Sequence, residues 1–133
     1  WFVDLEKALY GVPPIDLAHA TLTVATGWDP DSAARLTADQ VGGFYRRYLD
    51  RHDPEVATKM SPWLLPLRRL TWLRTITWFA RWQAAWQGGN HPASRDAKMT
   101  AHIAAHIAAC FETDAIAEAR IDWLESGLAR ALN

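Results

Sequence analysis

The chain contains 133 residues, with 14 basic and 15 acidic side chains, eight Trp and one Cys. Its length fits one compact domain with its own core, and a net charge of −1 gives no electrostatic basis for binding nucleic acid or an anionic membrane surface. A single Cys excludes an intramolecular disulfide framework, and no run of about eighteen uncharged apolar residues is present to span a bilayer. We therefore expect a soluble, cytoplasmic protein.

The apolar pattern predicts a mainly α protein in which one short strand precedes about five helices. Residues 1–5 are aromatic and β-branched up to an acid, which is typical of a short buried strand. Thr37, followed three residues later by Gln40, forms a capping box that opens a helix. The Gly42-Gly43 pair inside this helix predicts the close approach of another backbone. The predicted helices cover residues 15–26, 38–52, 66–87, 95–112 and 113–128. The apolar set predicted for the last helix is Ile116, Ile121, Trp123, Leu124 and Leu128.

The longest predicted helix carries most of the tryptophans. At roughly 100° per residue, its aromatic residues fall within one arc of about 120°, whereas Arg74 and Arg81 lie on another side. This segregation is typical of a helix that packs its aromatic face into the core. Arg68 projects into the same arc, and we expect it to stack on a Trp or to pair with a buried acid. The arc consists of Trp72, Trp78, Phe79, Trp82 and Trp86.

The most informative segment runs from Val3 to Ala18 and contains three short blocks. They read Val-Asp-Leu-Glu, then Gly-Val-Pro, then Asp-Leu-Ala. An acid at the end of a buried strand, here Asp4, is held rigidly and suits a hard cation such as Mg²⁺ shared with a nucleotide phosphate. A second acid at the start of a helix, here Asp16, can brace neighbouring loop backbone. The spacing alone is equally typical of ordinary turn and cap residues.

These blocks resemble the segment that follows the catalytic loop in the aminoglycoside phosphotransferase and choline kinase family of kinase-like enzymes. That family commonly reads Ile-Asp-(Phe or Trp)-Glu, then Gly-Asp-Pro, then Asp-Leu-Ala. The resemblance implies that Asp4 is the metal-binding acid and that Asp16 is a structural brace of the active site. Val12 stands where the family pattern has Asp, so the hydrogen bonds of that acid are not expected here, while the metal site is unaffected.

The resemblance further implies that residues 1–133 form the helical C-terminal subdomain of a protein-kinase-like fold. The complete enzyme would use ATP and Mg²⁺ to phosphorylate a hydroxyl group of a small-molecule acceptor, with an aminoglycoside, a choline-like amine and a sugar as open alternatives. The His-Gly-Asp loop and downstream Asn of the family are not found in the chain. We therefore expect no catalytic residue in this chain and no activity of the chain alone. We also expect self-association through the apolar surface that would contact the other lobe of the enzyme and that includes Trp1 to Val3.

A second hypothesis is a non-catalytic all-α module that binds a ligand or dimerises through a Trp-lined core. His102, His106 and Cys110 recur every four residues on one helix, and a metal-sensing protein would use the first two, because His at i and i+4 is a helical zinc arrangement. We expect them instead to be small polar residues on a half-buried face. The acids in first helical turns are expected to be caps. These acids are Asp29, Asp31, Asp39, Glu112, Asp114, Glu118 and Asp122.

Overall fold

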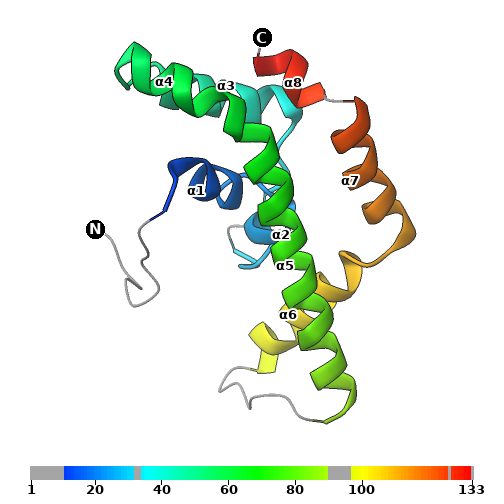
Figure 1. Cartoon of the computed structure of the whole chain (residues 1–133). Coiled ribbons are helices and arrows are strands. Elements are labelled where there is room, and N and C mark those ends of the chain that lie inside the picture. The colour runs from blue at the N-terminus through cyan, green and yellow to red at the C-terminus, as the bar shows by residue number, and fades with distance from the viewer. Residues whose placement is uncertain (1–10, 32–33, 90–96, 126, 133) are drawn as a thin grey trace.

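The computed structural model describes residues 11–31, 34–89, 97–125 and 127–132, and every regular element within these ranges is a helix. The long helix α5 (Leu64–Gln87) runs through the molecule, and the other helices are arranged around it (Figure 1). The mainly α prediction is confirmed for the described residues. The strand predicted at 1–5 lies outside them, and the kinase-like subdomain remains a prediction.

The described part of the chain contains more and shorter helices than the sequence predicts. The segment predicted as one helix over 15–26 consists of two helices separated by a turn, and the segment after 113 is likewise divided into two. The remaining elements are α1 (Pro13–His19), α2 (Thr23–Thr26), α3 (Ala38–Leu49), α4 (Pro54–Met60), the 3₁₀ turn η2 (Ser61–Trp63), α6 (Ala97–Ala109), α7 (Thr113–Glu125) and α8 (Gly127–Leu132).

Local side-chain chemistry explains where the helices begin. The predicted capping box is present at α3, because Thr37 Oγ1 accepts from the Gln40 N–H at 3.2 Å and Gln40 Oε1 accepts from the Thr37 N–H at 2.9 Å. At α4 the carboxylate of Asp53 accepts from the Glu55 N–H at 2.8 Å. Pro66 lies in the first turn of α5, where a missing N–H removes no intrahelical hydrogen bond.

A close approach to a glycine occurs at a different position from the predicted one. A Cβ added to Gly43 would meet nothing within 4 Å, so the prediction is wrong at this residue, although Gly42 beside it is buried. The crowded glycine is Gly27, at the C-terminal end of α2, where a Cβ would lie 2.5 Å from Cε1 of His106. The neighbour is a side chain from α6, which no local sequence pattern could indicate.

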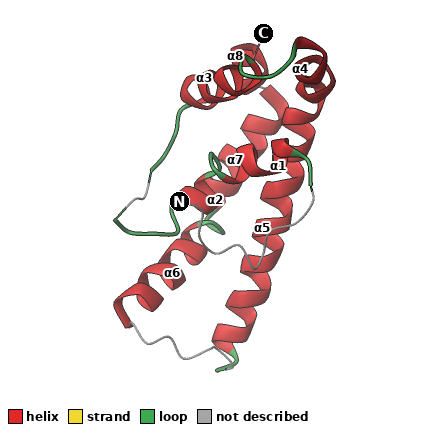
Figure 2. Cartoon of the chain, turned by 90° about the vertical axis from the view of Figure 1, so that its left-hand side faces the viewer, coloured by secondary structure: helices red, strands yellow, loops and turns green. Residues whose placement is uncertain are grey.

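Two apolar clusters form the core. One is built around Tyr45 of α3 and the other around Phe79 of α5, and both receive residues from α1 and α5. Figure 2 shows α3 and α8 together at one end of α5, with α6 beside its other end. The buried members of the first cluster are Leu17, Val41, Tyr45, Leu64 and Leu128, and those of the second are Ala18, Leu22, Val24, Phe79 and Ile107.

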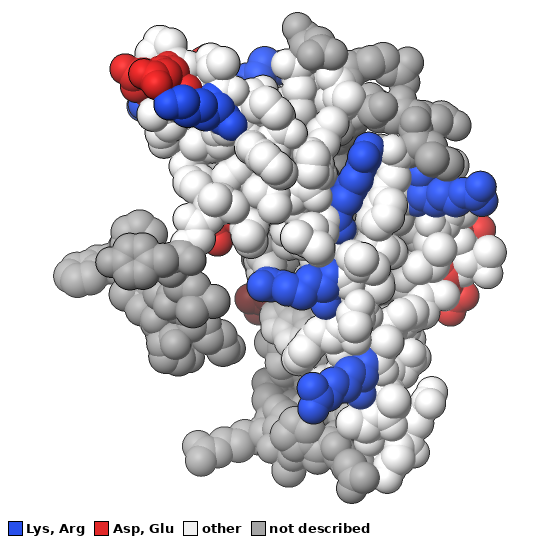
Figure 3. All heavy atoms as spheres, in the orientation of Figure 1, with Lys and Arg blue, Asp and Glu red and all other residues white. Residues whose placement is uncertain are grey.

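The predicted aromatic face of α5 is confirmed in part. Phe79 is 1% exposed, and Trp72 and Trp82 pack against the second cluster. Trp78 is 49% exposed, which corrects its predicted place in the core, although its ring still contacts Trp28 at a centroid distance of 5.8 Å. Figure 3 shows basic side chains spaced over the face of the molecule that it presents, with uncharged surface between them.

None of the helices in the described ranges combines the length and apolar character that crossing a membrane requires. In α5, the longest of them, arginines recur throughout the helix. Its exposed face nevertheless carries large apolar side chains, because Leu70, Leu73 and Trp78 are all accessible to solvent.

Candidate ligand-binding cavity

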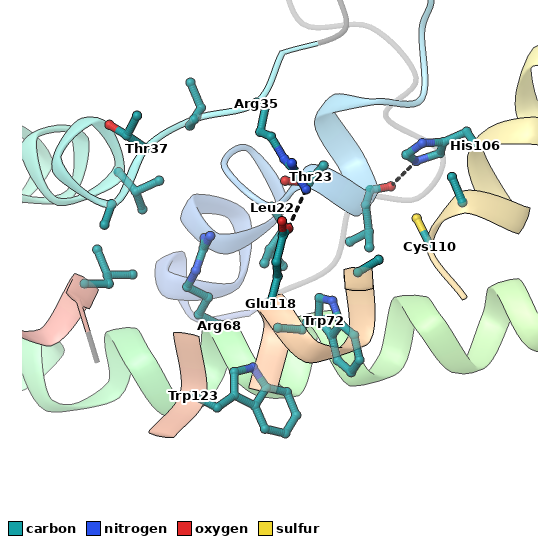
Figure 4. Close-up of a pocket in the computed structure, with 18 residues that line it drawn as sticks. Leu22, Thr23, Arg35, Thr37, Arg68, Trp72, His106, Cys110, Glu118 and Trp123 are labelled. Carbon is teal, nitrogen blue, oxygen red and sulfur yellow. Dashed lines mark hydrogen bonds and ion pairs between the residues drawn. The ribbon is translucent and has the colours of Figure 1, made fainter. Parts of the chain in front are cut away.

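A partly enclosed cavity of about 580 Å³ lies where α5 and α7 face each other. The loop before α3 and residues of α2 and α6 complete its wall (Figure 4). Pockets that bind small molecules fall in the same range of volume and combine an apolar lining with a few polar groups. The size and the lining therefore make this cavity the main candidate site in the described part of the chain.

The apolar part of the lining comes from two tryptophans and a row of alanines. Trp72 of α5 and Trp123 of α7 meet edge to face, with ring centroids 5.3 Å apart and an interplanar angle of 81°. Ala115 and Ala119 of α7 also line the cavity. Because α7 presents small side chains at these positions, space remains between the two helices.

This orientation of α7 corrects the apolar set predicted for the last helix. Ile116 is 40% exposed and Ile121 is 52% exposed, so both point away from the core. Trp123 and Leu128 face inward as predicted. The predicted partner Leu124 lies outside the side chains that the structure describes.

The principal polar group of the cavity is the half-buried guanidinium of Arg68. Its Nη1 donates to Thr21 Oγ1 at 2.7 Å and to the hydroxyl of Tyr45 at 3.4 Å, and its Nη2 donates to the Thr21 carbonyl at 3.4 Å. The Thr21 hydroxyl can accept the 2.7 Å bond because its own hydrogen is donated to the Leu17 carbonyl at 2.8 Å. This arrangement fixes the guanidinium between α1, α3 and α5.

Arg68 has no acidic partner among the described residues, which corrects the expected pairing with a buried acid. Three of its five N–H groups have acceptors, and Nε is buried with no acceptor from the residues that the structure describes. A buried donor without an acceptor costs roughly 1–3 kcal/mol, so this site carries an unsatisfied donor and an uncompensated positive charge.

The other charges of the cavity wall neutralise each other. Arg35 Nη2 donates to Glu118 Oε2 at 2.6 Å, and the two side chains are 67% and 59% exposed. An ion pair this exposed contributes little stability, but it joins the loop before α3 to α7. Figure 4 shows the pair bridging the cavity wall, with Arg68 reaching in from α5. Within the part of the lining that the structure describes, the remaining formal charge is therefore that of Arg68.

A second arginine of α5 holds the C-terminal turn of α7. Arg69 Nη2 donates to the Trp123 carbonyl at 2.7 Å. Carbonyls in the last turn of a helix lack intrahelical donors and carry partial negative charge, so a cation there is favourable. This bond keeps Trp123 against the cavity.

The two histidines of α6 are hydrogen-bond partners of backbone carbonyls. His102 Nε2 lies 3.0 Å from the Gly27 carbonyl, and His106 Nε2 lies 3.2 Å from the Val24 carbonyl. These contacts tie α6 to the C-terminal end of α2 and involve the Nε2 atom of each ring. No group of three or more metal-ligating side chains occurs within the described ranges, and burial raises the pKa of the Cys110 thiol.

The described residues of the predicted phosphotransferase motif do not line the cavity. Asp16 is exposed in the first turn of α1, and its carboxylate has no hydrogen bond or ion pair with the described residues. The next two residues, Leu17 and Ala18, are buried in the two core clusters. Asp4 lies outside the described residues, so its predicted metal site has no geometry here.

Two of the predicted acids, Asp39 and Asp114, lie in first helical turns. Asp29 caps no helix and instead accepts from the Asp31 N–H at 2.8 Å in the turn after α2. Glu118 differs, because it pairs with Arg35.

Comparison of the chain with known protein families, curated proteins and solved structures finds no match. Function must therefore be argued from the residues themselves. Sequence analysis missed Arg35 and Trp123 as cavity residues. The available signal was the spacing of Ala115, Ala119 and Trp123, which recur every four residues and so share one helix face.

Proposed function

We propose that the chain is the helical C-terminal portion of an ATP-dependent phosphotransferase that acts on a hydroxyl group of a small molecule. The observation that supports this proposal is the geometry of the Asp-Leu-Ala block. Leu17 and Ala18 anchor α1 in the core, while Asp16 points to solvent without a partner in the described residues. An acid held in this way is available to brace a loop supplied by the rest of the enzyme.

In this proposal the two acids have different tasks. Asp4 would be a magnesium ligand, since carboxylate oxygens suit a hard cation, and Asp16 would position the catalytic loop. Bound Mg²⁺ supplies charge neutralisation for the transferred phosphoryl group. The chain contains no catalytic base in this proposal, so activity belongs to the complete protein.

The test measures magnesium-dependent ATP binding and ADP release by the complete protein with an aminoglycoside, choline or a hexose as acceptor. We expect Asp4→Ala to abolish the magnesium dependence of ATP binding and of turnover. Asp50→Asn is the matched control, because Asp50 is an exposed acid at the end of α3, outside the motif, and it should leave both unchanged.

Three results would exclude the phosphotransferase proposal. The first is a complete sequence without a His-x-Asp loop and downstream Asn shortly before Trp1. The second is ATP binding by the complete protein that does not respond to Mg²⁺. The third is unchanged magnesium-dependent turnover in Asp4→Ala.

A non-catalytic all-α ligand-binding module is the second candidate, and the cavity between α5 and α7 favours it. This candidate predicts that the 133-residue chain unfolds cooperatively and elutes as a monomer in size-exclusion chromatography. The phosphotransferase proposal predicts self-association of the isolated chain through the surface that would face the missing lobe. The two candidates therefore give opposite chromatographic results.

A further inference from the structure

We propose that the cavity between α5 and α7 binds a small aromatic carboxylate, with the carboxylate on Arg68 and the ring against Trp72 and Trp123. This inference concerns the cavity alone. It holds whether or not Asp4 and Asp16 serve phosphoryl transfer.

The Arg68 side chain is held in place without a described negative partner. Thr21 and Tyr45 hold the guanidinium in place, but both are neutral partners. Buried polar groups in folded proteins are normally satisfied, and an exception calls for an explanation. Nε itself is inaccessible, but Nη2 carries two N–H groups and has only one acceptor among the described residues. A carboxylate in the cavity that accepts from Nη2 would compensate the charge of Arg68.

The charged side chains of the lining favour a ligand with one negative charge. The lining contains two arginines and one glutamate with formal charges, and Arg35 already pairs with Glu118. Among the described lining residues, one positive charge remains for the ligand to neutralise. Glu118 would repel a second negative charge, so a monoanion such as a carboxylate is favoured over a dianionic phosphate.

The apolar side chains of the lining favour a ligand that carries an aromatic ring. The edge-to-face pair of Trp72 and Trp123 offers aromatic surface, and Ala115 and Ala119 leave space beside it. Aromatic rings gain from offset or edge contacts with other rings beyond the burial of their area. A ring joined to a carboxylate by a short linker therefore matches both parts of the lining.

The experiment uses the 133-residue chain and isothermal titration calorimetry with phenylacetate. The reference ligand is phenylacetamide, which has nearly the same shape but no charge. We expect phenylacetate to bind about tenfold or more tightly than the amide, which corresponds to about 1.4 kcal/mol. Acetate alone should bind much more weakly than phenylacetate, because it lacks the ring.

Variants locate the site. In Arg68→Gln the preference for the carboxylate should disappear, and in the matched control Arg74→Gln, at an exposed position on the same helix, it should persist. Ala119→Phe should abolish binding of both ligands by filling the cavity while leaving Arg68 in place. Circular dichroism shows whether each variant folds.

The proposal is overturned if the wild-type chain binds neither ligand, if it binds both with equal affinity, or if a folded Arg68→Gln variant keeps the preference. Should Arg68→Gln fail to fold, alkylation of Cys110 provides a second measurement, because this thiol also lines the cavity. Phenylacetate should slow its alkylation in the wild-type chain more than phenylacetamide does at the same concentration. Equal protection by the two ligands contradicts the proposed role of Arg68.

Discussion

Replacing Gly27 by Ala tests the contact that joins α2 to α6. The new Cβ would lie 2.5 Å from His106 Cε1 and 2.8 Å from Nδ1, about 1 Å short of a favourable carbon contact. The ring would have to move away from the Val24 carbonyl and from Phe79, which it meets at a centroid distance of 5.8 Å. Overpacking of this kind costs roughly 1–3 kcal/mol.

Part of this cost is offset in the unfolded state. Gly27 has φ −89°, which Ala adopts without strain. The substitution lowers the conformational entropy of the unfolded chain and thereby raises the unfolding free energy by roughly 0.4–1 kcal/mol. We therefore expect Gly27→Ala to lower the unfolding free energy by about 1–2 kcal/mol. In a His106→Ala background the close ring contact is gone, and the same substitution should cost about 0–0.5 kcal/mol, since only the Thr23 carbonyl at 3.1 Å remains tight.

Urea unfolding followed by far-ultraviolet circular dichroism measures all four proteins of this double-mutant cycle. Gly43→Ala is the matched control, because nothing lies within 4 Å of its added Cβ, and it should stabilise the chain by about 0.5–1 kcal/mol as a Gly-to-Ala change inside a helix. Equal destabilisation by Gly27→Ala with and without the His106 ring would refute the reasoning.

Three further predictions concern the α3 cap, the core and the cysteine. Thr37→Ala removes the capping box and should cost about 1 kcal/mol in urea unfolding, whereas Thr77→Ala, at an exposed position in mid-helix, should change stability by at most about 0.5 kcal/mol; equal effects would contradict the cap assignment. Phe79→Ala should cost about 3–5 kcal/mol, and a similar loss in Trp78→Ala would be incompatible with the different burial of the two rings. Because burial raises the pKa of the Cys110 thiol, less thiolate is present near neutral pH. Iodoacetamide should therefore alkylate it more slowly than a cysteine peptide, with a rate that rises as the pH increases toward that pKa; alkylation as fast as that of the peptide would disagree.

Local patterns predicted local structure well. The capping box at Thr37 depends on residues three positions apart, and the end of α5 before Gly88 follows from the Gly pair that succeeds it. The burial of Phe79 follows from the helical period. Each of these features is determined by neighbours along the chain, so the sequence contains the necessary information.

The cavity could not be predicted in the same way. It depends on the rotation of α7, which turns Ala115 and Ala119 inward and leaves Ile116 exposed. The side-chain contacts that fix this rotation join distant parts of the chain, and one of them pairs Arg35 with Glu118 across 83 positions. Hydrophobicity alone favours the opposite orientation.

The division of the core into two clusters has a consequence for cooperativity. Leu17 and Ala18 are consecutive residues of α1 that belong to different clusters, and α5 supplies Leu64 to one and Phe79 to the other. At 1.5 Å per residue, α5 extends over roughly 36 Å as one continuous helix. Because α1 and α5 contribute residues to both clusters, loss of packing in one cluster destabilises the helices on which the other cluster depends. Amide hydrogen exchange should therefore report a common opening free energy in α1 and the middle of α5, so that the two clusters behave as one folding unit.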